Sequence, residues 1–215
     1  MSSQFLVQVI NRHRMTVDGK GVTTLVGLFG CPLKCKLCIN KNVLSENKFR
    51  RMTPEMLWNE LSIDYCYYLA SGGGITFGGG ESLLHAGAII EFVKILPPGV
   101  SVNLETSLNA PISDKLFLET VDSVLETGGE LIIDIKSLDK DIYKSYTGLD
   151  NGKVLRRLEM LLEKGYQDKC QIRVPVIPDV KDKSIAESEA TSIEKMGFNN
   201  IDLFNYIIRD YMIEK

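Results

Sequence analysis

Short apolar, β-branched runs alternate with amphipathic segments of helical length through most of the chain. Strands that are joined by helices must run parallel, because each crossover returns the chain to the same edge of the sheet, and right-handed crossovers curl such a sheet toward a barrel. The alternation therefore predicts an α/β fold, a partial (β/α)6 barrel. The six predicted strands are Val22–Phe29, Ile75–Phe77, Val100–Leu104, Leu131–Ile135, Gln171–Ile177 and Ile201–Tyr206.

Helix-terminal signals fall between these runs. Thr53 followed by Pro54 predicts a helix start, and Ser184 with Glu187 has the spacing of a capping box. Gly165 and Gly197 stand where the helix C-caps are expected. We expect the residues before Val22 to form a short extra strand or a loop.

Length and charge limit the class of protein. A chain of 215 residues is typical of one domain with one core, so a single domain over residues 1–215 is expected. A net charge of −3 gives no basic field for phosphate backbones, which predicts no nucleic-acid partner. No apolar run approaches the ~20 residues of a membrane span, and residues 1–14 lack a signal-peptide pattern. We therefore expect a cytoplasmic protein without a membrane partner.

Three of the five cysteines, Cys31, Cys35 and Cys38, lie directly after the first predicted strand. Their CxxxCxxC spacing is not a disulfide framework and indicates a metal site. Three thiolates can each bind one iron of a 4Fe-4S cube and leave the fourth iron open to a chelating amino and carboxylate group. The alternative is a structural zinc site, but zinc needs four closed ligands, and no nearby histidine or further cysteine completes the set.

This spacing after a first strand resembles the cluster motif of the radical S-adenosylmethionine (SAM) superfamily. The stretch from Thr16-Val17-Asp18-Gly19 through Cys38-Ile39-Asn40 resembles its glycyl-radical-enzyme activating branch, of the pyruvate formate-lyase activating enzyme type. The resemblance implies a 4Fe-4S cluster, SAM as cofactor, a glycyl radical enzyme as partner and flavodoxin or ferredoxin as reductant. Cys66 is the only cysteine between Cys38 and Gly72, so we expect the type of activating enzyme that lacks additional iron-sulfur clusters.

A glycine-rich turn, Gly78-Gly79-Gly80-Glu81, follows the second predicted strand, and glycines there let the backbone approach a ligand closely. The resemblance assigns Gly79, Gly80 and Glu81 to the amino group of SAM. It also implies that Ile39 contributes its backbone to the cofactor site.

Acidic and basic side chains follow the later strands, where a barrel carries its chemistry. The resemblance implies that Glu105, which replaces an aspartate of the family, contacts the SAM ribose, and that Thr106 and Asp134 hold a monovalent cation with it. Lys136 and Arg173 match basic residues near the same ligand. Val174 and Pro175 are expected to line the adenine. Taken without the resemblance, each charged residue fits a solvated or structural ion pair equally well.

Other chemically distinctive residues are assigned to structure. His13 and His85 lack partners at catalytic spacing, and His85 is expected at a surface or a helix cap. Cys66 and Cys170 are expected to be small buried hydrophobes. The aromatic cluster is expected to pack, and its members are Trp58, Tyr65, Tyr67 and Tyr68.

Two rival functions stay open. Lys20 and Thr23 depart from the activating branch, and Phe204–Ile207 lacks its usual histidine. The first rival is therefore a radical SAM enzyme that modifies a small molecule or peptide. The second is a metal-binding module that has lost SAM chemistry, against which the Gly79–Glu81 turn argues.

Overall fold

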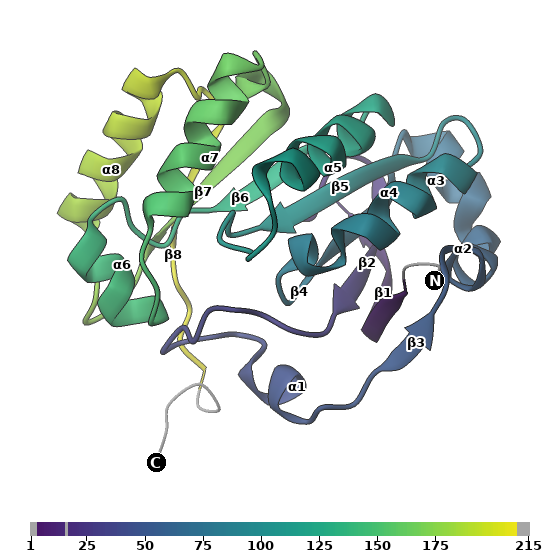
Figure 1. Ribbon diagram of the computed structural model, residues 1–215, viewed down its shortest axis with the longest axis horizontal. Coiled ribbons are helices and arrows are strands. Elements are labelled where there is room, and N and C mark those ends of the chain that lie inside the picture. Colours follow the sequence, from purple (N-terminus) through teal and green to yellow (C-terminus); the bar gives the residue numbers. More distant parts are fainter. Residues whose placement is uncertain (1–3, 16, 210–215) are drawn as a thin grey trace.

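The computed structural model describes residues 4–15 and 17–209, and these form one curved sheet with helices on one face (Figure 1). The eight strands are ordered β3-β1-β2-β4-β5-β6-β7-β8. Their bounds are β1 Phe5–Met15, β2 Val22–Leu28, β3 Arg50–Met52, β4 Gly74–Gly79, β5 Ser101–Thr106, β6 Leu131–Asp134, β7 Cys170–Val176 and β8 Ile201–Asn205.

Six strands of the sheet run parallel and follow one another in chain order: β2, β4, β5, β6, β7 and β8. They correspond to the six predicted runs, so the α/β partial barrel is confirmed. Among the described strands, β3 at one edge and β8 at the other each pair with a single neighbour, so the barrel does not close.

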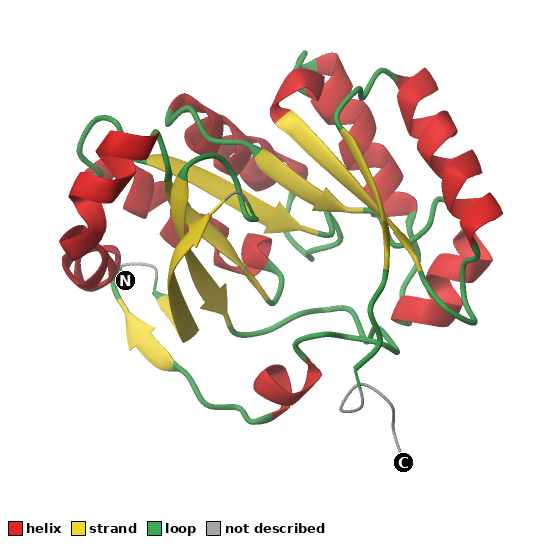
Figure 2. Ribbon diagram, turned by 180° about the vertical axis from the view of Figure 1, so that it is seen from behind, coloured by secondary structure: helices red, strands yellow, loops and turns green. Residues whose placement is uncertain are grey.

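Helices connect the parallel strands and cover the outer face of the sheet (Figure 1). Figure 2 shows the opposite face, where the strands lie in front of the helices. The helices are α1 Lys41–Ser45, α2 Pro54–Leu61, α3 Tyr65–Ser71, α4 Ala86–Ile95, α5 Asp114–Glu126, α6 Lys140–Thr147, α7 Gly152–Glu163 and α8 Lys183–Met196, with 3-10 turns η1 Ser62–Asp64, η2 Ser82–His85 and η3 Gln167–Lys169.

Most predicted helix ends are correct. Thr53 caps α2 by accepting a hydrogen bond from the Met56 amide, with Pro54 in the first helical position. Gly197 ends α8 in the left-handed conformation that favours glycine. The capping box at Ser184 is wrong, because Asp182 is the N-cap of α8 and accepts from the Ile185 amide at 2.9 Å. Asp182 is itself a strong capping residue and stands two positions upstream of Ser184, so the helix starts there.

The apolar side chains of the strands pack under the helices. Phe5 stacks on Phe77 with ring centroids 5.1 Å apart, and Phe92 meets both rings edge-on at 5.8 and 5.4 Å. Tyr68 lies buried with its hydroxyl bonded to Thr24. Trp58 contacts Tyr65 edge-on, so packing is confirmed for most of the aromatic cluster, although Tyr67 is exposed. Because neighbouring residues of a strand point to opposite faces, the concave face receives the polar positions.

The N-terminal region is larger than predicted. β1 is an eleven-residue strand antiparallel to β2, and β3 extends the sheet beyond it. The turn after β1 enters the sheet: the Asp18 carbonyl accepts hydrogen bonds from Thr76 and Asn103, which face each other on β4 and β5. Thr16, part of the same stretch, lies outside the described residues.

Two lone residues differ from expectation. Cys66 is exposed, so its prediction as a buried hydrophobe is wrong, whereas Cys170 is buried as expected. His85 occupies the N-cap position of α4 but makes no side-chain cap; its side chain is buried and its Nε2 lies 3.0 Å from the Phe29 carbonyl oxygen. Among the described residues, no helix is long and apolar enough to cross a membrane.

Candidate functional site

The cysteine loop, residues 29–40, leaves the C-terminal end of β2 and is held from two distant parts of the chain. The amides of Lys34 and Lys36 donate to the carbonyls of Thr147 and Tyr146 at the end of α6, at 2.8 and 3.1 Å. The Tyr206 hydroxyl, beyond β8, donates to the carbonyl of Leu37. These contacts fix the backbone on which all three clustered cysteines stand.

The glycine turn after β4 packs directly against this loop. The Gly80 amide donates to Leu28 O at 3.0 Å, and the Glu81 amide donates to Gly30 O at 2.8 Å. Asn40, at the far end of the cysteine loop, donates from Nδ2 to Gly79 O at 2.7 Å. The two segments therefore form one hydrogen-bonded unit.

Steric contact explains why glycines occupy this turn. A Cβ on Gly80 would lie 2.2 Å from Gly30 O and 2.6 Å from Leu28 O, both of them backbone atoms that cannot move aside. Gly79 has φ of +85°, where an L side chain is strained. The sequence predicts that these glycines let the backbone approach a ligand. The structure shows that they are already needed for the glycine turn to contact residues 28–30.

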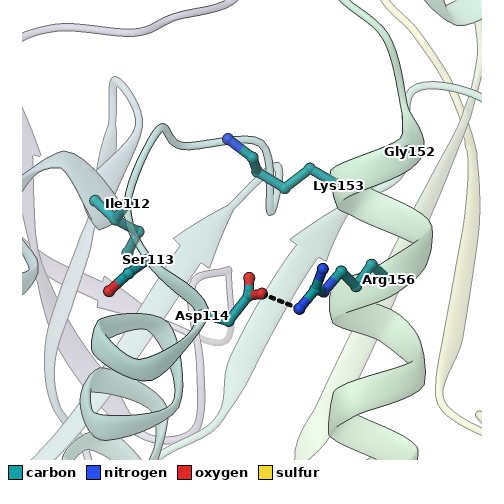
Figure 3. Close-up of a pocket in the computed structure, with 6 residues that line it drawn as sticks. All are labelled: Ile112, Ser113, Asp114, Gly152, Lys153 and Arg156. Atoms are coloured by element: carbon teal, nitrogen blue, oxygen red, sulfur yellow. Dashed lines mark ion pairs between the residues drawn. The ribbon is translucent and has the colours of Figure 1, made fainter.

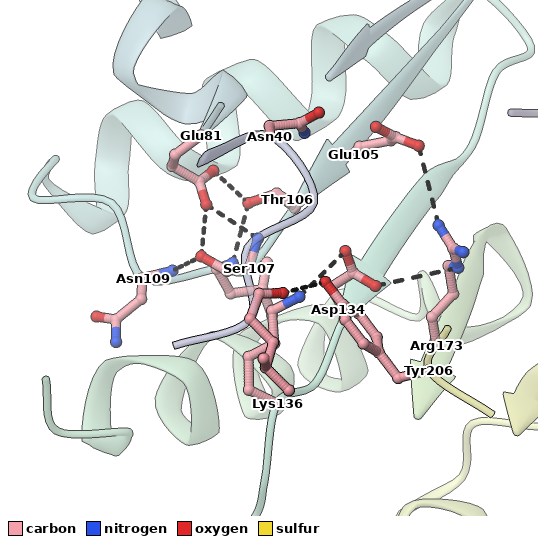
Figure 4. A network of polar contacts seen from close by, with 12 residues as sticks. Asn40, Glu81, Glu105, Thr106, Ser107, Asn109, Asp134, Lys136, Arg173 and Tyr206 are labelled. Carbon is pink, nitrogen blue, oxygen red and sulfur yellow. Dashed lines mark hydrogen bonds and ion pairs between the residues drawn. The ribbon is translucent and has the colours of Figure 1, made fainter. Parts of the chain in front are cut away.

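The Glu81 carboxylate is buried and accepts four hydrogen bonds. Oε1 accepts from Thr106 Oγ1 at 2.6 Å and from the Leu83 amide at 3.2 Å. Oε2 accepts from both the amide and the hydroxyl of Ser107, at 2.9 and 2.5 Å (Figure 4). Glu81 therefore ties the glycine turn to the end of β5, and Thr106 lies against it.

A line of alternating charges crosses the ends of β5 to β8. Asp134, Arg173 and Asp202 are paired in register on β6, β7 and β8, so their side chains point to the same face. The Arg173 guanidinium lies 4.0 Å from Asp134 and 4.0 Å from Glu105 on β5 (Figure 4). It also lies 3.6 Å from Asp202 and 5.0 Å from the centre of the Phe204 ring.

Glu105 has a perturbed carboxyl group. Burial, together with the negative charges of Asp134 and Asp18, raises its pKa to about 7, against the opposing effect of Arg173 and Arg14. The carboxylate rests against Gly78, where a Cβ would lie 2.0 Å from Glu105 Oε2. Gly78 thus provides the room for a glutamate at this position.

Lys136 connects the charges to the cysteines. Its Nζ lies 3.4 Å from Asp134 Oδ2. Burial acts to lower the Lys136 pKa, but Asp134 and then Cys35, Tyr146 and Tyr206 outweigh burial, and the pKa is raised. The ammonium in turn favours the thiolate of Cys35.

A match to a family model covers residues 25–190, which is the stretch from β2 to α8, and the model is described as the radical SAM superfamily. The chain belongs to the radical SAM superfamily. It is an enzyme of that superfamily, and its resemblance to the activating branch is confirmed by the curated relatives that it matches.

Two examples of these relatives, both named as activating enzymes, are the following. The (2S)-3-sulfopropanediol dehydratase activating enzyme of Klebsiella oxytoca is 27% identical over 82% of this chain and 73% of the relative. The pyruvate formate-lyase 1-activating enzyme of Escherichia coli is 27% identical over 78% of this chain and 66% of the relative. A solved structure, Streptococcus suis SuiB bound to S-adenosylmethionine, shares the fold with a TM-score of 0.62, at 13% identity over 84% of this chain and 39% of SuiB.

The cysteine loop of this radical SAM enzyme fits an iron-sulfur cube better than a single metal ion. Within the described part of the chain, no three cysteine, histidine, aspartate or glutamate side chains converge as they would on one ion. In a cube each thiolate binds its own iron, so the sulfurs stand apart. Burial raises the pKa of the partly buried Cys35, and the neighbouring thiols repel one another as thiolates. Such thiols become ligands when a cation neutralises them.

The structure brings most of the predicted residues to one end of the sheet. Glu105, Asp134, Lys136 and Arg173 form the charged network, and Glu81 and Thr106 form a hydrogen-bonded pair beside it. The side chain of Ile39 is half exposed, while Pro175 is buried and paired with Phe204 on β8. The roles of these residues toward SAM stay predictions.

Several residues around the site are not among those predicted from the sequence. Ser107 and Asn109 follow β5 directly, so the rule that chemistry lies after strand ends identifies them. Asn109 donates to the Tyr143 hydroxyl and to the Asp150 carbonyl, both at 2.9 Å. Tyr206 carries no sequence signal, because its contact with Leu37 spans 169 positions.

A hollow of about 390 Å³ lies between the starts of α5 and α7 (Figure 3). Lys153 and Arg156 line it, but both are already engaged. Lys153 donates to the Ala110 carbonyl at 3.2 Å, and Arg156 pairs with Asp114 at 2.6 Å. This hollow lies outside the charged network.

Proposed function

We propose that this radical SAM enzyme activates a glycyl radical enzyme. Bound at Cys31, Cys35 and Cys38, a reduced 4Fe-4S cluster would supply the electron that splits the C5′–S bond of SAM into methionine and a 5′-deoxyadenosyl radical, which takes a glycine Cα hydrogen. Support comes from the family and from relatives that are themselves named activating enzymes. The proposed unit is a single radical SAM domain over residues 1–215.

One observation carries the proposal: the cysteine loop and the Gly79–Glu81 turn are bonded to each other, as a cluster and its chelated cofactor require. The Glu81 amide is bonded to Gly30 and the Gly79 carbonyl to Asn40, so both loops keep a fixed separation.

The charged network supplies the remaining contacts for SAM in this proposal. Lys136 and Arg173 would bind the carboxylate and orient the ligand, and Glu105 would accept from the ribose hydroxyls. Pro175 and the Ile39 backbone would border the adenine. Burial around these groups strengthens each contact, because water competes less for them.

A monovalent cation at Glu105, Thr106 and Asp134 also belongs to the proposal, and two of these residues already have partners. Thr106 Oγ1 already donates to Glu81, and Asp134 lies 3.4 Å from the ammonium of Lys136. The cation would therefore have to compete with Lys136 for Asp134.

The open edge of the barrel suits a protein partner. Among the described strands, β3 and β8 are not paired with each other, so the sheet keeps two separate edges and does not close into a full barrel. A glycine-bearing loop of a partner could enter there, and flavodoxin or ferredoxin would supply the electron. Both partners, and a cytoplasmic location, belong to the proposal.

The first test is anaerobic reconstitution with iron and sulfide, reduction with dithionite, and assay of 5′-deoxyadenosine. We expect the wild type to cleave SAM, Cys35→Ala to lose both the cluster absorbance and cleavage, and the exposed Cys66→Ser to retain both. A wild-type cluster that is inert toward SAM would favour the metal-binding module.

The second test separates the activase from the enzyme that modifies a small molecule or peptide. The reconstituted protein is mixed with SAM and a candidate glycyl radical enzyme encoded beside it, and the glycyl radical is followed by electron paramagnetic resonance. The activase predicts a signal that needs both proteins. Cleavage of SAM without that signal favours the rival.

A further inference from the structure

A lysine and a glutamate are buried together behind the charged network. Lys181 lies between β7 and α8, and its side chain is 0% exposed; Glu189 lies on α8, and its side chain is 8% exposed. Lys181 Nζ donates to Glu189 Oε2 at 2.7 Å. The Lys181 backbone is fixed by paired hydrogen bonds with Ile177, each 2.8 Å.

The other oxygen of Glu189 holds the segment that follows Lys136. Oε1 accepts from the Leu138 amide at 2.7 Å, from the Asp139 amide at 3.5 Å and from the Ser137 hydroxyl. On the opposite side, Asn151 Nδ2 donates to the Leu138 carbonyl at 2.7 Å. Residues 137–139 are thus clamped between α8 and the start of α7.

The clamped segment continues into the support of the cysteine loop. Asp139 caps α6 by accepting from the amides of Asp141 and Ile142, at 2.9 and 2.8 Å. The far end of α6 accepts the two amides of the cysteine loop, those of Lys34 and Lys36. One carboxylate on α8 therefore anchors the segment between Lys136 and the helix that holds the cysteines.

Stability alone does not account for such a pair. Burying two charges is costly, and an apolar pair of similar volume often stabilises a core equally well. Burial lowers the pKa of Lys181 while Glu189 opposes that effect, as expected for an ammonium removed from water. What an apolar pair cannot do is accept hydrogen bonds from Ser137 and Leu138.

We propose that Lys181 and Glu189 are a positioning pair that sets the placement of Lys136 and of α6 beneath the cysteine loop. Lys181 orients the Glu189 carboxylate through its hydrogen bond to Oε2, and Glu189 holds residues 137–139 in place. The effect of this pair on SAM binding rests on the proposed function. Its effect on the placement of residues 137–139 and α6 does not.

Two double variants test the pair without leaving a charge buried alone. K181M/E189Q keeps an amide oxygen that accepts from Ser137 and Leu138, whereas K181M/E189L keeps none. In reconstituted protein we expect the leucine variant to exchange the amide hydrogens of residues 34–36 and 137–142 about tenfold faster, and to bind SAM about tenfold more weakly. The glutamine variant should stay within about threefold of wild type in both.

Each outcome separates the two claims. If the leucine variant shows faster local exchange but the wild type does not bind SAM, the positioning pair is supported and the proposed function is wrong. Equal exchange and equal SAM affinity in both variants, or a uniform rise in exchange over the whole chain, would overturn the positioning pair.

A milder variant covers the case in which the leucine variant does not fold. Ser137→Ala leaves the ion pair intact and removes one donor to Glu189. We expect residues 137–142 to exchange about threefold faster in this variant, with the rest of the chain unchanged. Exchange equal to wild type in that segment would overturn the proposal.

Discussion

The two halves of the site are held together by different means. On the β2–β4 side, the cysteine loop and the glycine turn meet through backbone hydrogen bonds such as Gly80 N to Leu28 O. On the β5–β8 side, side-chain charges such as Glu105, Asp134 and Arg173 set the arrangement. The first half therefore depends on the absence of side chains at a few positions, and the second on the identity of the side chains present.

The largest effect is expected from adding one methyl group to the backbone-held half. In Gly80→Ala the new Cβ would meet two carbonyl oxygens at 2.2 and 2.6 Å, so the loops must separate. We expect a loss of about 3 kcal/mol in the free energy of unfolding and little bound iron after reconstitution. Urea unfolding and iron analysis measure these quantities.

Gly152→Ala is the matched control for that substitution. Its Cβ would meet only Asp150 Oδ1, at 2.9 Å, which is the end of an exposed side chain rather than backbone and also accepts from the Gly152 amide at 2.7 Å. Stability within about 1 kcal/mol of wild type is expected, because alanine favours the helix. Equal losses in the two variants would show that the close approach at Gly80 is not what holds the loops.

On the β5–β8 side, the free energy of unfolding should depend on pH through Glu105. The pKa of Glu105 is raised to about 7, so between its ordinary value and 7 the folded chain binds a proton that the unfolded chain has released. Stability then falls as pH rises through that window and levels off above it. Glu105→Gln should remove this dependence, with a difference of about 3 kcal/mol at most between pH 5 and pH 8.

The measurement is urea unfolding of wild type and Glu105→Gln at a series of pH values without cofactors. Parallel pH profiles for the two proteins would mean that Glu105 titrates normally. In that case the charges on β5–β8 would be solvated, and the contrast between the two halves would weaken.

The smallest effect is expected at Ile39, whose side chain is half exposed on the backbone-held half. Ile39→Ala keeps the backbone and should change the free energy of unfolding by less than about 1 kcal/mol. Its SAM dissociation constant, from calorimetry of the reconstituted protein, should change by less than about threefold. A tenfold loss would show that this half also relies on a side chain.

The sequence predicts the parts of the molecule that repeat a local rule. The six parallel strands follow from apolar runs, and the grouping of the three cysteines on one loop follows from their spacing. Both signals lie within a few residues of the chain. The helix start at Thr53 is correct for the same reason, while Asp182 replaces Ser184 as a cap because two good capping residues stand two positions apart.

Contacts between distant segments could not be predicted in this way. The role of Glu81 toward SAM stays a prediction, but its hydrogen bonds with Thr106 and Ser107 carry no local signal, because these residues reach it only once β4 and β5 are side by side. The exposure of Cys66 depends on which side of the short helix α3 faces the sheet, and the pattern around it is too short to decide that.

The hydrogen bond between Tyr206 and Leu37 has a consequence for the order of events during synthesis. Leu37, in the middle of the cysteine loop, emerges from the ribosome 169 residues before the tyrosine that holds the loop, a delay on the order of 10 to 30 s at usual rates of translation. The support from Tyr146 and Thr147 also arrives late. The nascent thiols therefore stay exposed to oxidants and stray metals, and we expect cluster insertion to follow release of the chain.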